Sequence, residues 1–472
     1  MKMIIDGNHT DAVSGKTFDN INPFNGELIN KIPLSEKVDY EIAVQAARKA
    51  QPEWYLTPLQ ERMDILSRFV GLVRKNKDDI VNIMCAEGGK LIGEAKSEVD
   101  NFCTVFESCI NGARRFFSSG TYDDENDSAY GNAVFTERLP LGVFFIIVPS
   151  SFPVGFIAYK TAPAIAAGNA VILKPDIATS GSALYLTELM IQAGMPDGVV
   201  QCLTGSDAAA AEFLYETDDV DAICTIGEKS AFYNLKSISQ FRRVFMDGVN
   251  NSAFIVLENA ELDLAIEQAV KDRTYNAGQS DFAAKHFFVH KNVFEEFKQL
   301  LVERLGRIVM GDPVNPGVNL GPLVSAEAAD KAGKYITMAL NRGAKCILGG
   351  SVEGSFLSPT ILTSVPENTE VYGPVFSITE FDSSEELVKK LNRDRVGPVC
   401  RIYAKNIGQA VRISTALSVE SCVINGTASF ASVQYPGDED KYLELGVKDY
   451  RFPFLEYTKQ KTIYINPELP IL

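Results

Sequence analysis

The stretch that decides the fold is residues 142–175, GVFFIIVPSSFPVGFIAYKTAPAIAAGNAVILKP. Residues 142–148 are almost all large and apolar, as in a strand buried on both faces of a sheet. The apolar spacing over 154–167 predicts a helix, and the Gly-Asn pair after it suits a left-handed helix end. Residues 170–174 predict a second strand, which the following proline stops. The pattern indicates a strand, a crossover helix and a parallel strand.

The same alternation continues on both sides of this unit. Downstream, the pattern predicts helices over 180–193 and 208–215 and strands over 199–203, 222–225 and 243–246. Upstream, residues 39–118 hold long amphipathic segments, such as 39–49 and 59–75, that predict a helical layer on the sheet. A second α/β series from 252 to 424 has predicted strands at 254–257, 287–290 and 402–404. We therefore expect an α/β protein with a doubly wound sheet and a second α/β domain.

Composition narrows the function. The chain has 472 residues, a length that predicts two or three domains. Its 45 Lys and Arg against 61 Asp and Glu give a net charge of −16. A surface this negative repels nucleic acid and anionic lipid. We therefore expect no nucleic-acid partner.

The cysteines and the apolar segments indicate a cytoplasmic protein. The eight cysteines are scattered without CxxC pairs, and only three histidines accompany them, so we predict reduced thiols and no metal site. Residues 139–159 carry no charge over about the length of a membrane span, but prolines and glycines interrupt them. The N-terminus reaches an acidic residue after five positions, unlike an export signal. We expect neither a membrane segment nor export.

Short motifs point to a family. The phosphate-binding patterns GxGxxG and GxxxxGK[ST] are both absent. Other motifs follow one another along the chain: Pro149-Ser-Ser-Phe-Pro153, Lys160 with Ala162-Pro163-Ala164, Ala167-Gly168-Asn169, Leu173-Lys174-Pro175, Asn276-Ala-Gly278-Gln279, Gly311-Asp312-Pro313 with Gly321-Pro322, and Glu370-Val-Tyr-Gly373-Pro374. Together they resemble the NAD(P)-dependent aldehyde dehydrogenase superfamily, over essentially the whole chain.

The resemblance implies an aldehyde dehydrogenase-like α/β fold. Its parts would be a Rossmann-type cofactor domain, a second α/β catalytic-type domain and a β oligomerisation arm. We assign residues 1–118 and 140–247 to the cofactor domain, 248–440 to the catalytic-type domain, and 119–139 with 441–472 to the arm. Such an arm implies a homodimer or a homotetramer.

The resemblance also implies a chemistry that this sequence does not keep intact. In the family, a cysteine thiolate attacks the aldehyde, hydride passes to the nicotinamide, and a glutamate activates the water that hydrolyses the thioester. Asp281 stands at the nucleophile position, Asp247 at the general-base position and Ser151 at the oxyanion position, while Lys160 matches its motif. An ionised aspartate is a poor nucleophile, and its adduct would be an anhydride. The alternative for Asp281 is an inert, hydrogen-bonded carboxylate.

The cofactor positions are better kept. Lys174 and Glu370 match the residues that contact the two riboses of the cofactor in the family, and Tyr372 belongs to the same motif as Glu370. Gly227 belongs to the turn that would meet the pyrophosphate, although Ile226 replaces a glycine beside it. Lys174 and Glu370 are alternatively partners in salt bridges.

The choice between NAD and NADP stays open in the sequence. Three residues after Lys174, where the family's NAD-dependent members carry a glutamate, this chain has Ile177, with Asp176 beside it. We expect NAD or NADP as the cofactor, if the nucleotide site is open.

Three hypotheses follow from these residues. The first is a pseudoenzyme with a binding, regulatory or assembly role, with an active family member or another protein as a possible partner. The second is an NAD(P)-dependent oxidoreductase that takes hydride from an aldehyde hydrate, with Asp281 or Asp247 as the base and no covalent thiol intermediate. The third is chemistry without redox, such as hydrolysis or isomerisation in the same cleft.

Overall fold

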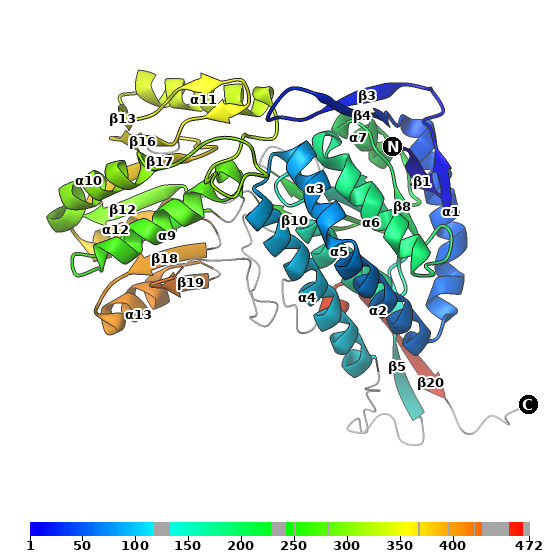
Figure 1. Ribbon diagram of the computed structural model, residues 1–472. Helices are drawn as coiled ribbons and strands as arrows, with labels where there is room; N and C mark the ends of the chain where they lie inside the picture. Colours follow the sequence, from blue (N-terminus) through cyan, green and yellow to red (C-terminus); the bar gives the residue numbers. More distant parts are fainter. Residues whose placement is uncertain are drawn as a thin grey trace, which may run out of the picture.

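The computed structural model describes residues 1–117, 133–227, 242–248, 252–280, 283–366, 369–394, 397, 399–419, 421–426 and 453–465. Within them the chain forms two lobes, each built on a seven-stranded sheet, which Figure 1 shows side by side. The strands of the first sheet come from residues 3–248 and those of the second from residues 253–424. The predicted α/β fold is confirmed.

The first sheet has the strand order β10-β9-β6-β7-β8-β1-β2. Its strands are β1 (Met3–Ile5), β2 (Asn8–Thr10), β6 (Val143–Val148), β7 (Ala170–Pro175), β8 (Val200–Cys202), β9 (Ala222–Gly227) and β10 (Arg243–Gly248). The five strands β6 to β10 are parallel, and β1 is antiparallel to both β2 and β8. Because β6 lies between β7 and β9, the chain winds outward from β6 in both directions, as expected of a doubly wound sheet.

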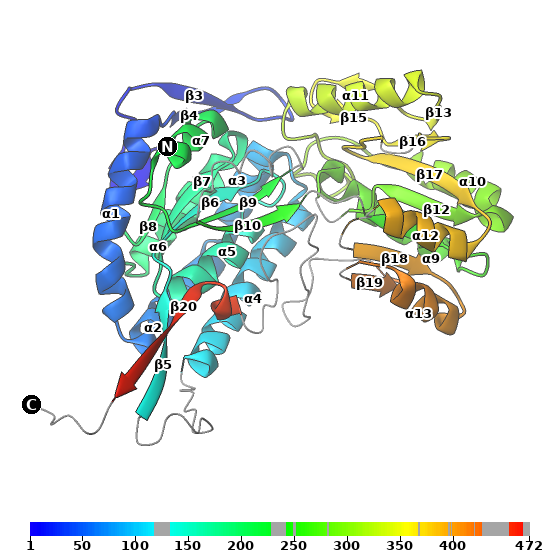
Figure 2. The ribbon, with the colours of Figure 1, turned by 180° about the vertical axis from the view of Figure 1, so that it is seen from behind.

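Helices cover both faces of the first sheet, as Figure 2 shows from behind. On one face lie α2 (Leu59–Lys75), α3 (Lys77–Gly88), α4 (Ile92–Phe116), α5 (Gly155–Ala166) and α6 (Ser180–Gln192), and on the other α1 (Lys37–Leu56) and α7 (Asp207–Glu216). Side chains of β6 alternate between these layers, since Phe144 and Ile146 pack with the first group and Phe145 with the second. The apolar run 143–148 is therefore buried on both faces, as predicted.

The second sheet has the order β13-β16-β17-β12-β11-β18-β19, with only the edge strand β13 antiparallel. Its strands are β11 (Ala253–Val256), β12 (His286–His290), β13 (Lys345–Leu348), β16 (Thr360–Thr363), β17 (Val375–Phe381), β18 (Val399–Tyr403) and β19 (Ser421–Ile424). One face packs against α9 (Leu262–Thr274) and α10 (Phe294–Leu305), and the other against α12 (Ser384–Asp394) and α13 (Ile407–Ala416). Helix α11 (Ala326–Asn341) covers the β16 side.

A pair of long strands extends from the first lobe at the bottom of Figure 1. Strand β5 (Ala133–Pro140) pairs antiparallel with β20 (Thr458–Ile465) over eight residue pairs. Tyr457, just before β20, stacks on Phe144 and Phe245 with ring centroids 5.2 and 5.3 Å away. The Asn169 amide also donates to the Tyr457 carbonyl at 3.0 Å. The segment around β20 therefore completes the core of the first lobe.

The remaining elements are small. Two-stranded sheets join β3 (Thr17–Ile21) with β4 (Leu28–Pro33) and β14 (Val352–Glu353) with β15 (Phe356–Leu357). Short 3-10 helices are η1 (Ile177–Thr179), η2 (Tyr275–Gly278), η3 (Lys291–Val293) and η4 (Pro453–Leu455). No helix in the described part of the chain combines the length and apolarity that a bilayer span requires.

One predicted helix is longer than the sequence indicated. The segment expected at 39–49 belongs to α1, which continues to Leu56 in spite of Pro52. Trp54 explains the extension, because its buried indole donates to the Ile165 carbonyl at 3.0 Å and ties the last turn to α5. Tertiary packing here outweighs the local cost of proline.

Candidate functional site

Four predicted site residues lie at the carboxyl ends of parallel strands in the first sheet. Lys174 and Asp247 are the second-last residues of β7 and β10, Gly227 is the last residue of β9, and Ser151 follows β6 by three residues. The strand order switches between β6 and β9, since successive strands are added on the β7 side first and on the β9 side afterwards, and doubly wound sheets bind ligands outside the strand ends at such a point. For Asp247 only the backbone is described.

The half-buried side chain of Ile226 packs against the core of the first lobe. This core lies between the first sheet and the α2–α6 layer and contains Cys224, two residues earlier in β9. Gly227, paired in register with Gly248, is left at the strand end. Ile226 replaces a glycine of the predicted phosphate turn, but its side chain packs against the core, and two glycines stand at the adjacent strand ends.

The start of α5 already holds an internal carboxylate. Glu98 of α4 accepts hydrogen bonds from the backbone N–H groups of Val154 at 3.0 Å and Gly155 at 2.8 Å. In the common dinucleotide fold, the first crossover helix offers these groups to pyrophosphate. Here the Glu98 carboxylate occupies these N–H groups, so they are not available to bind a phosphate. This agrees with the absence of the GxGxxG motif from the sequence.

Lys90 neutralises Glu98 and links the two lobes. Both side chains are buried, and the Lys90 ammonium donates to the Glu98 carboxylate and, at 3.0 Å, to the Ser151 carbonyl. It also lies 4.7 Å from the ring centroid of Phe152 and 5.8 Å from that of Tyr275. Since Tyr275 follows α9, this cation is shared between the lobes.

The segment 275–280 packs against the turn after β6. The Asn276 side chain donates to the Ser151 carbonyl at 2.9 Å. Asn276 and Ala277 both have a left-handed backbone, with φ of 50° and 52°. Such a backbone is costly for residues other than glycine and occurs often at functional sites.

Gly278 is held against the second predicted cofactor motif. Its φ is 72°, and a Cβ atom there would lie 2.3 Å from the carbonyl carbon and oxygen of Gly373. Only glycine fits this contact. The structure thus joins the motifs Asn276–Gln279 and Glu370–Pro374, which the sequence listed separately.

Tyr372 and Glu370 differ in their surroundings. The Tyr372 hydroxyl donates to Gln279 Oε1 at 3.4 Å, an atom that also accepts from the Val324 N–H at 2.9 Å. Tyr372 is half-buried and Glu370 is exposed. The structure therefore anchors Tyr372 to the 275–280 segment and leaves the Glu370 carboxylate at the surface.

The residues around position 281 are held by a buried ion pair that the sequence did not reveal. Asp281 itself lies outside the described residues. On its far side, Asp272 accepts from the Ala284 N–H at 2.7 Å and pairs with Arg401 of β18 at 2.9 Å. Nothing in the sequence signals this pair, because 129 residues separate its members.

A second buried cation accompanies this pair. Arg273 is fully buried and donates through Nε to the Val375 carbonyl at 2.9 Å. Burial lowers its pKa to about 10. Burial, with nearby Lys285, Arg273 and Lys390, lowers the pKa of His286 to about 4, so this imidazole is neutral at pH 7. Buried basic groups therefore gather where β12 and β17 begin.

Lys160 and Lys174 are both buried but have different partners. Lys160, on α5, places its ammonium 5.6 Å from the ring centroid of Phe156. Lys174 forms an ion pair with Asp207, the first residue of α7. A salt-bridge role, which the sequence left open for Lys174, is thus present, and this salt bridge lies at the strand end where a nucleotide is expected.

None of the eight cysteines, all of them in the described residues, lies in the 275–286 segment. Six are buried, Cys346 is exposed and Cys422 is half-buried. Burial raises the pKa to about 11 for Cys85 and Cys103 and about 12 for Cys202, which keeps these thiols protonated and unreactive. Cys85, Cys103 and Cys109 all lie in the buried core of the first lobe.

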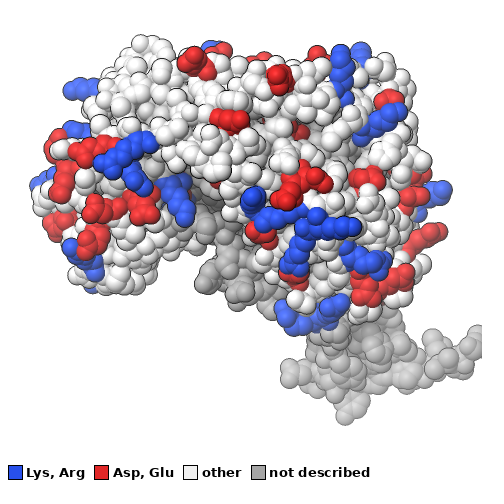
Figure 3. Space-filling model, in the orientation of Figure 1, with Lys and Arg blue, Asp and Glu red and all other residues white. Residues whose placement is uncertain are grey.

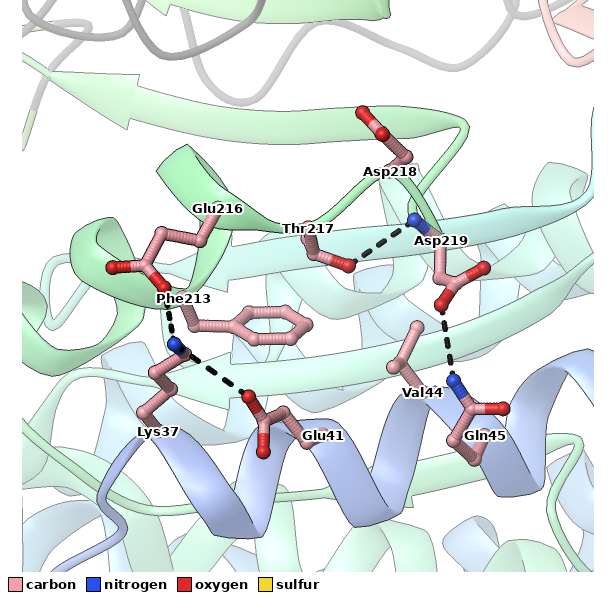
Figure 4. Close-up of a pocket in the computed structure, with 9 residues that line it drawn as sticks. All are labelled: Lys37, Glu41, Val44, Gln45, Phe213, Glu216, Thr217, Asp218 and Asp219. Carbon is pink, nitrogen blue, oxygen red and sulfur yellow. Dashed lines mark hydrogen bonds and ion pairs between the residues drawn. The ribbon is translucent and has the colours of Figure 1, made fainter.

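Two surface hollows lie away from the strand ends just described. One, of about 470 Å³, lies between the start of α4, the end of α9 and the loop 313–318. The other, of about 490 Å³, lies between α1 and the residues after α7, at the amino end of β9. Figure 4 shows that most of the polar side chains of this second hollow pair with one another. Lys37 forms ion pairs with Glu216 and Glu41, and the Gln45 amide donates a hydrogen bond to Asp219. Acidic and basic side chains are interspersed over the face in Figure 3.

Comparisons with known proteins agree with this geometry. A model described as the aldehyde dehydrogenase family matches residues 9–463. The chain is 31% identical to 3-sulfolactaldehyde dehydrogenase of Pseudomonas putida, over 98% of this chain and 96% of that protein. It is 29% identical to the succinate-semialdehyde dehydrogenase [NADP(+)] GabD of Escherichia coli K12, over 95% of each.

Solved structures show the same fold. A 3,6-anhydro-L-galactose dehydrogenase in complex with NAP superimposes with a TM-score of 0.92 at 28% identity, covering 98% of each chain. PnpE in complex with nicotinamide adenine dinucleotide gives 0.92 at 27% identity, covering 100% of this chain and 98% of that chain. These matches confirm the fold that the resemblance implied.

Proposed function

Because the chain belongs to the aldehyde dehydrogenase family, we propose that it is a nucleotide-binding member that has lost thiol-dependent aldehyde oxidation. The observation that carries the proposal is the residue at the nucleophile position, Asp281, in a chain whose eight cysteines all lie elsewhere. A thiolate both attacks the carbonyl and leaves in hydrolysis, and a carboxylate replaces it in neither step. The protein is then a pseudoenzyme with a binding, regulatory or assembly role.

The other reacting positions support the same conclusion. Asp247 is one methylene shorter than the glutamate of the family, and catalytic reach is sensitive to such a change. Ser151 offers a hydroxyl where an amide would stabilise the oxyanion, and its carbonyl already accepts from Lys90 and Asn276. A carboxylate at 281 would also oppose negative charge on the substrate oxygen.

Nucleotide binding is the part of the function that we propose is kept. The residues present fit a dinucleotide, because the strand ends offer a lysine ammonium at 174 and backbone without side chains at Gly227. Glu370 and Tyr372 would contact the nicotinamide end. Bound NAD(P) would supply a nicotinamide that can accept a hydride. Two of the solved relatives carry NAD or NAP, which supports the proposal.

We also propose the assembly and its location. The cofactor domain would comprise 1–118 and 140–247, the catalytic-type domain 248–440, and the arm 119–139 with 441–472. The eight-pair ladder of β5 and β20, which leaves the first lobe in Figure 1, supports a role as an arm. The protein would act in the cytoplasm as a homodimer or homotetramer, or beside an active family member.

The deciding experiment compares the protein with its Asp281→Cys variant. Both are mixed with NAD or NADP and a panel of aldehydes that includes succinate semialdehyde, and reduced nucleotide is followed by absorbance. We expect no signal above the protein-free blank for the natural chain. Measurable turnover by the natural chain would overturn the pseudoenzyme proposal, and turnover that thiol alkylation abolishes would show that thiol-dependent oxidation is kept.

The same assay distinguishes the second candidate, hydride transfer from an aldehyde hydrate without a thiol. The observation in its favour is that both altered positions, 281 and 247, are carboxylates that can accept a proton. It predicts turnover in the natural chain that Asp281→Ala or Asp247→Ala abolishes. Turnover unchanged in both variants would remove this candidate.

A further inference from the structure

The carboxyl end of β7 carries an ion pair between a buried lysine and an exposed aspartate. The Lys174 side chain is only 2% exposed and pairs with Asp207, whose side chain is 85% exposed. A buried ammonium thus reaches the surface at its tip, where an exposed carboxylate covers it.

The topology explains why these residues meet although 33 positions separate them. Strands β7 and β8 are parallel neighbours, with Leu173 opposite Cys202 and the Leu203 N–H donating to the Leu173 carbonyl at 2.9 Å. A short loop after β8 then brings Asp207 to the start of α7. Ser206 caps this helix by accepting from the Ala209 N–H at 3.2 Å, so the Asp207 carboxylate can turn to Lys174.

A second carboxylate lies at the same strand end. Asp176, two residues after Lys174, accepts from the Ala178 N–H at 2.9 Å. Burial raises its pKa, and the charges of Lys174 and Asp207 both act on it. With Asp176 ionised, the three side chains carry one positive and two negative charges.

Lys174, Asp207 and Asp176 lie at the strand end where a dinucleotide fold binds the adenosine ribose. In doubly wound dinucleotide folds, the end of the second strand meets the adenosine ribose, where a carboxylate binds the 2′-hydroxyl and a basic residue accommodates a 2′-phosphate. Here the second strand is β7. The carboxylate expected at 177 is missing, since Ile177 stands there. Asp207 supplies a carboxylate to the same strand end from the neighbouring connection.

We propose that Asp207 is the residue that selects NAD over NADP in this protein. Its carboxylate would accept a hydrogen bond from the ribose hydroxyl of NAD, with Lys174 holding it in place. The 2′-phosphate of NADP would instead face Asp207 and Asp176, while Lys174 is already neutralised. The inference rests on the proposed nucleotide binding. The preference for NAD would differ from that of the relative GabD, whose name gives NADP as its cofactor.

The test is calorimetric titration of the full chain with NAD and with NADP, without aldehyde. We expect NAD to bind about 10- to 100-fold more tightly, the range for one hydrogen bond to a charged group. In Asp207→Asn, Lys174 is released from its carboxylate, so the NAD preference should fall at least about tenfold, mainly through tighter NADP binding.

The matched control is Asp218→Asn, which removes one exposed carboxylate beyond the opposite end of α7. It should leave the ratio of the two affinities unchanged. Thermal unfolding of each variant without nucleotide shows that it is folded, and the ratio in the natural chain tests the proposal without any variant.

The outcomes separate the two proposals. NADP binding as tight as NAD in the natural chain, or an Asp207→Asn ratio equal to that of the natural chain, overturns the selection and leaves nucleotide binding intact. Binding of neither nucleotide refutes the proposed nucleotide function, and the selection falls with it.

Discussion

Exchange of the buried pair Lys90 and Glu98 tests how the two lobes are joined. We consider Lys90→Met, Glu98→Gln and the double variant. The ammonium has two oxygen acceptors, the Glu98 carboxylate and the Ser151 carbonyl, and lies against the rings of Phe152 and Tyr275. Methionine keeps the volume and removes the charge, and glutamine keeps an acceptor for the start of α5.

The structure predicts unequal and non-additive effects. Lys90→Met leaves a fully buried carboxylate with the two backbone N–H donors of α5, and loss of one partner of a buried pair costs about 3–5 kcal/mol. Glu98→Gln leaves the ammonium its carbonyl and two rings, so we expect about 2–4 kcal/mol. The double variant carries no unpaired charge. Its loss should therefore be smaller than the sum by at least about 2 kcal/mol.

The assay is urea unfolding followed by the fluorescence of Trp54, the single tryptophan, which is buried in the first lobe. As a control, the exposed pair Arg74 and Glu107, joined by bonds of 2.6 and 2.8 Å, is changed in the same way. Its coupling should stay below about 1 kcal/mol. If the Lys90 and Glu98 losses add to within about 0.5 kcal/mol, the pair is not coupled and our account is wrong.

Two further predictions concern stability. Gly278→Ala should cost about 2–4 kcal/mol, because its Cβ would lie 2.3 Å from the Gly373 carbonyl at a φ of 72°. By contrast, Gly71→Ala on α2 should raise the unfolding midpoint, because no atom lies within 4 Å of the added Cβ. An equal loss of stability in the two variants would refute the proposed clash between residue 278 and Gly373. Burial raises the pKa of Glu87 from 4.5 to about 7. The folded state therefore holds this proton more tightly than the unfolded state, and the resulting stability is lost progressively as pH rises from about 4.5 through 7. The free energy of unfolding should fall by at most about 1.4 kcal/mol per pH unit in this window, and Glu87→Gln should flatten the profile; an unchanged slope would contradict the assignment.

The sequence predicted the sheets well because their signal is local. Apolar runs such as 143–148 are buried on both faces, and the segments between them have helical spacing. The short strand Met3–Ile5, which adds to the first sheet, carries too few residues to be recognised. Its place depends on Ile4 pairing with Cys202, about 200 residues away.

The site was predictable in its motifs but not in its partners. Lys174 was found from the residues around it, whereas its ion pair with Asp207 depends on which strand lies beside β7. The pair of Asp272 and Arg401 was missed for the same reason, since it joins a helix to a distant strand. Charged partners far apart in the chain leave no periodic pattern, so only the fold reveals them.

The packing of Tyr457 against Phe144 and Phe245 has a consequence for synthesis on the ribosome. All strands of the second sheet lie within residues 253–424, so they emerge as one continuous stretch and can fold together. The aromatic stack of the first lobe lacks Tyr457 until that whole stretch has been translated. The lobe that begins first is therefore completed last, and until then it exposes an apolar face to the chaperones that meet nascent chains.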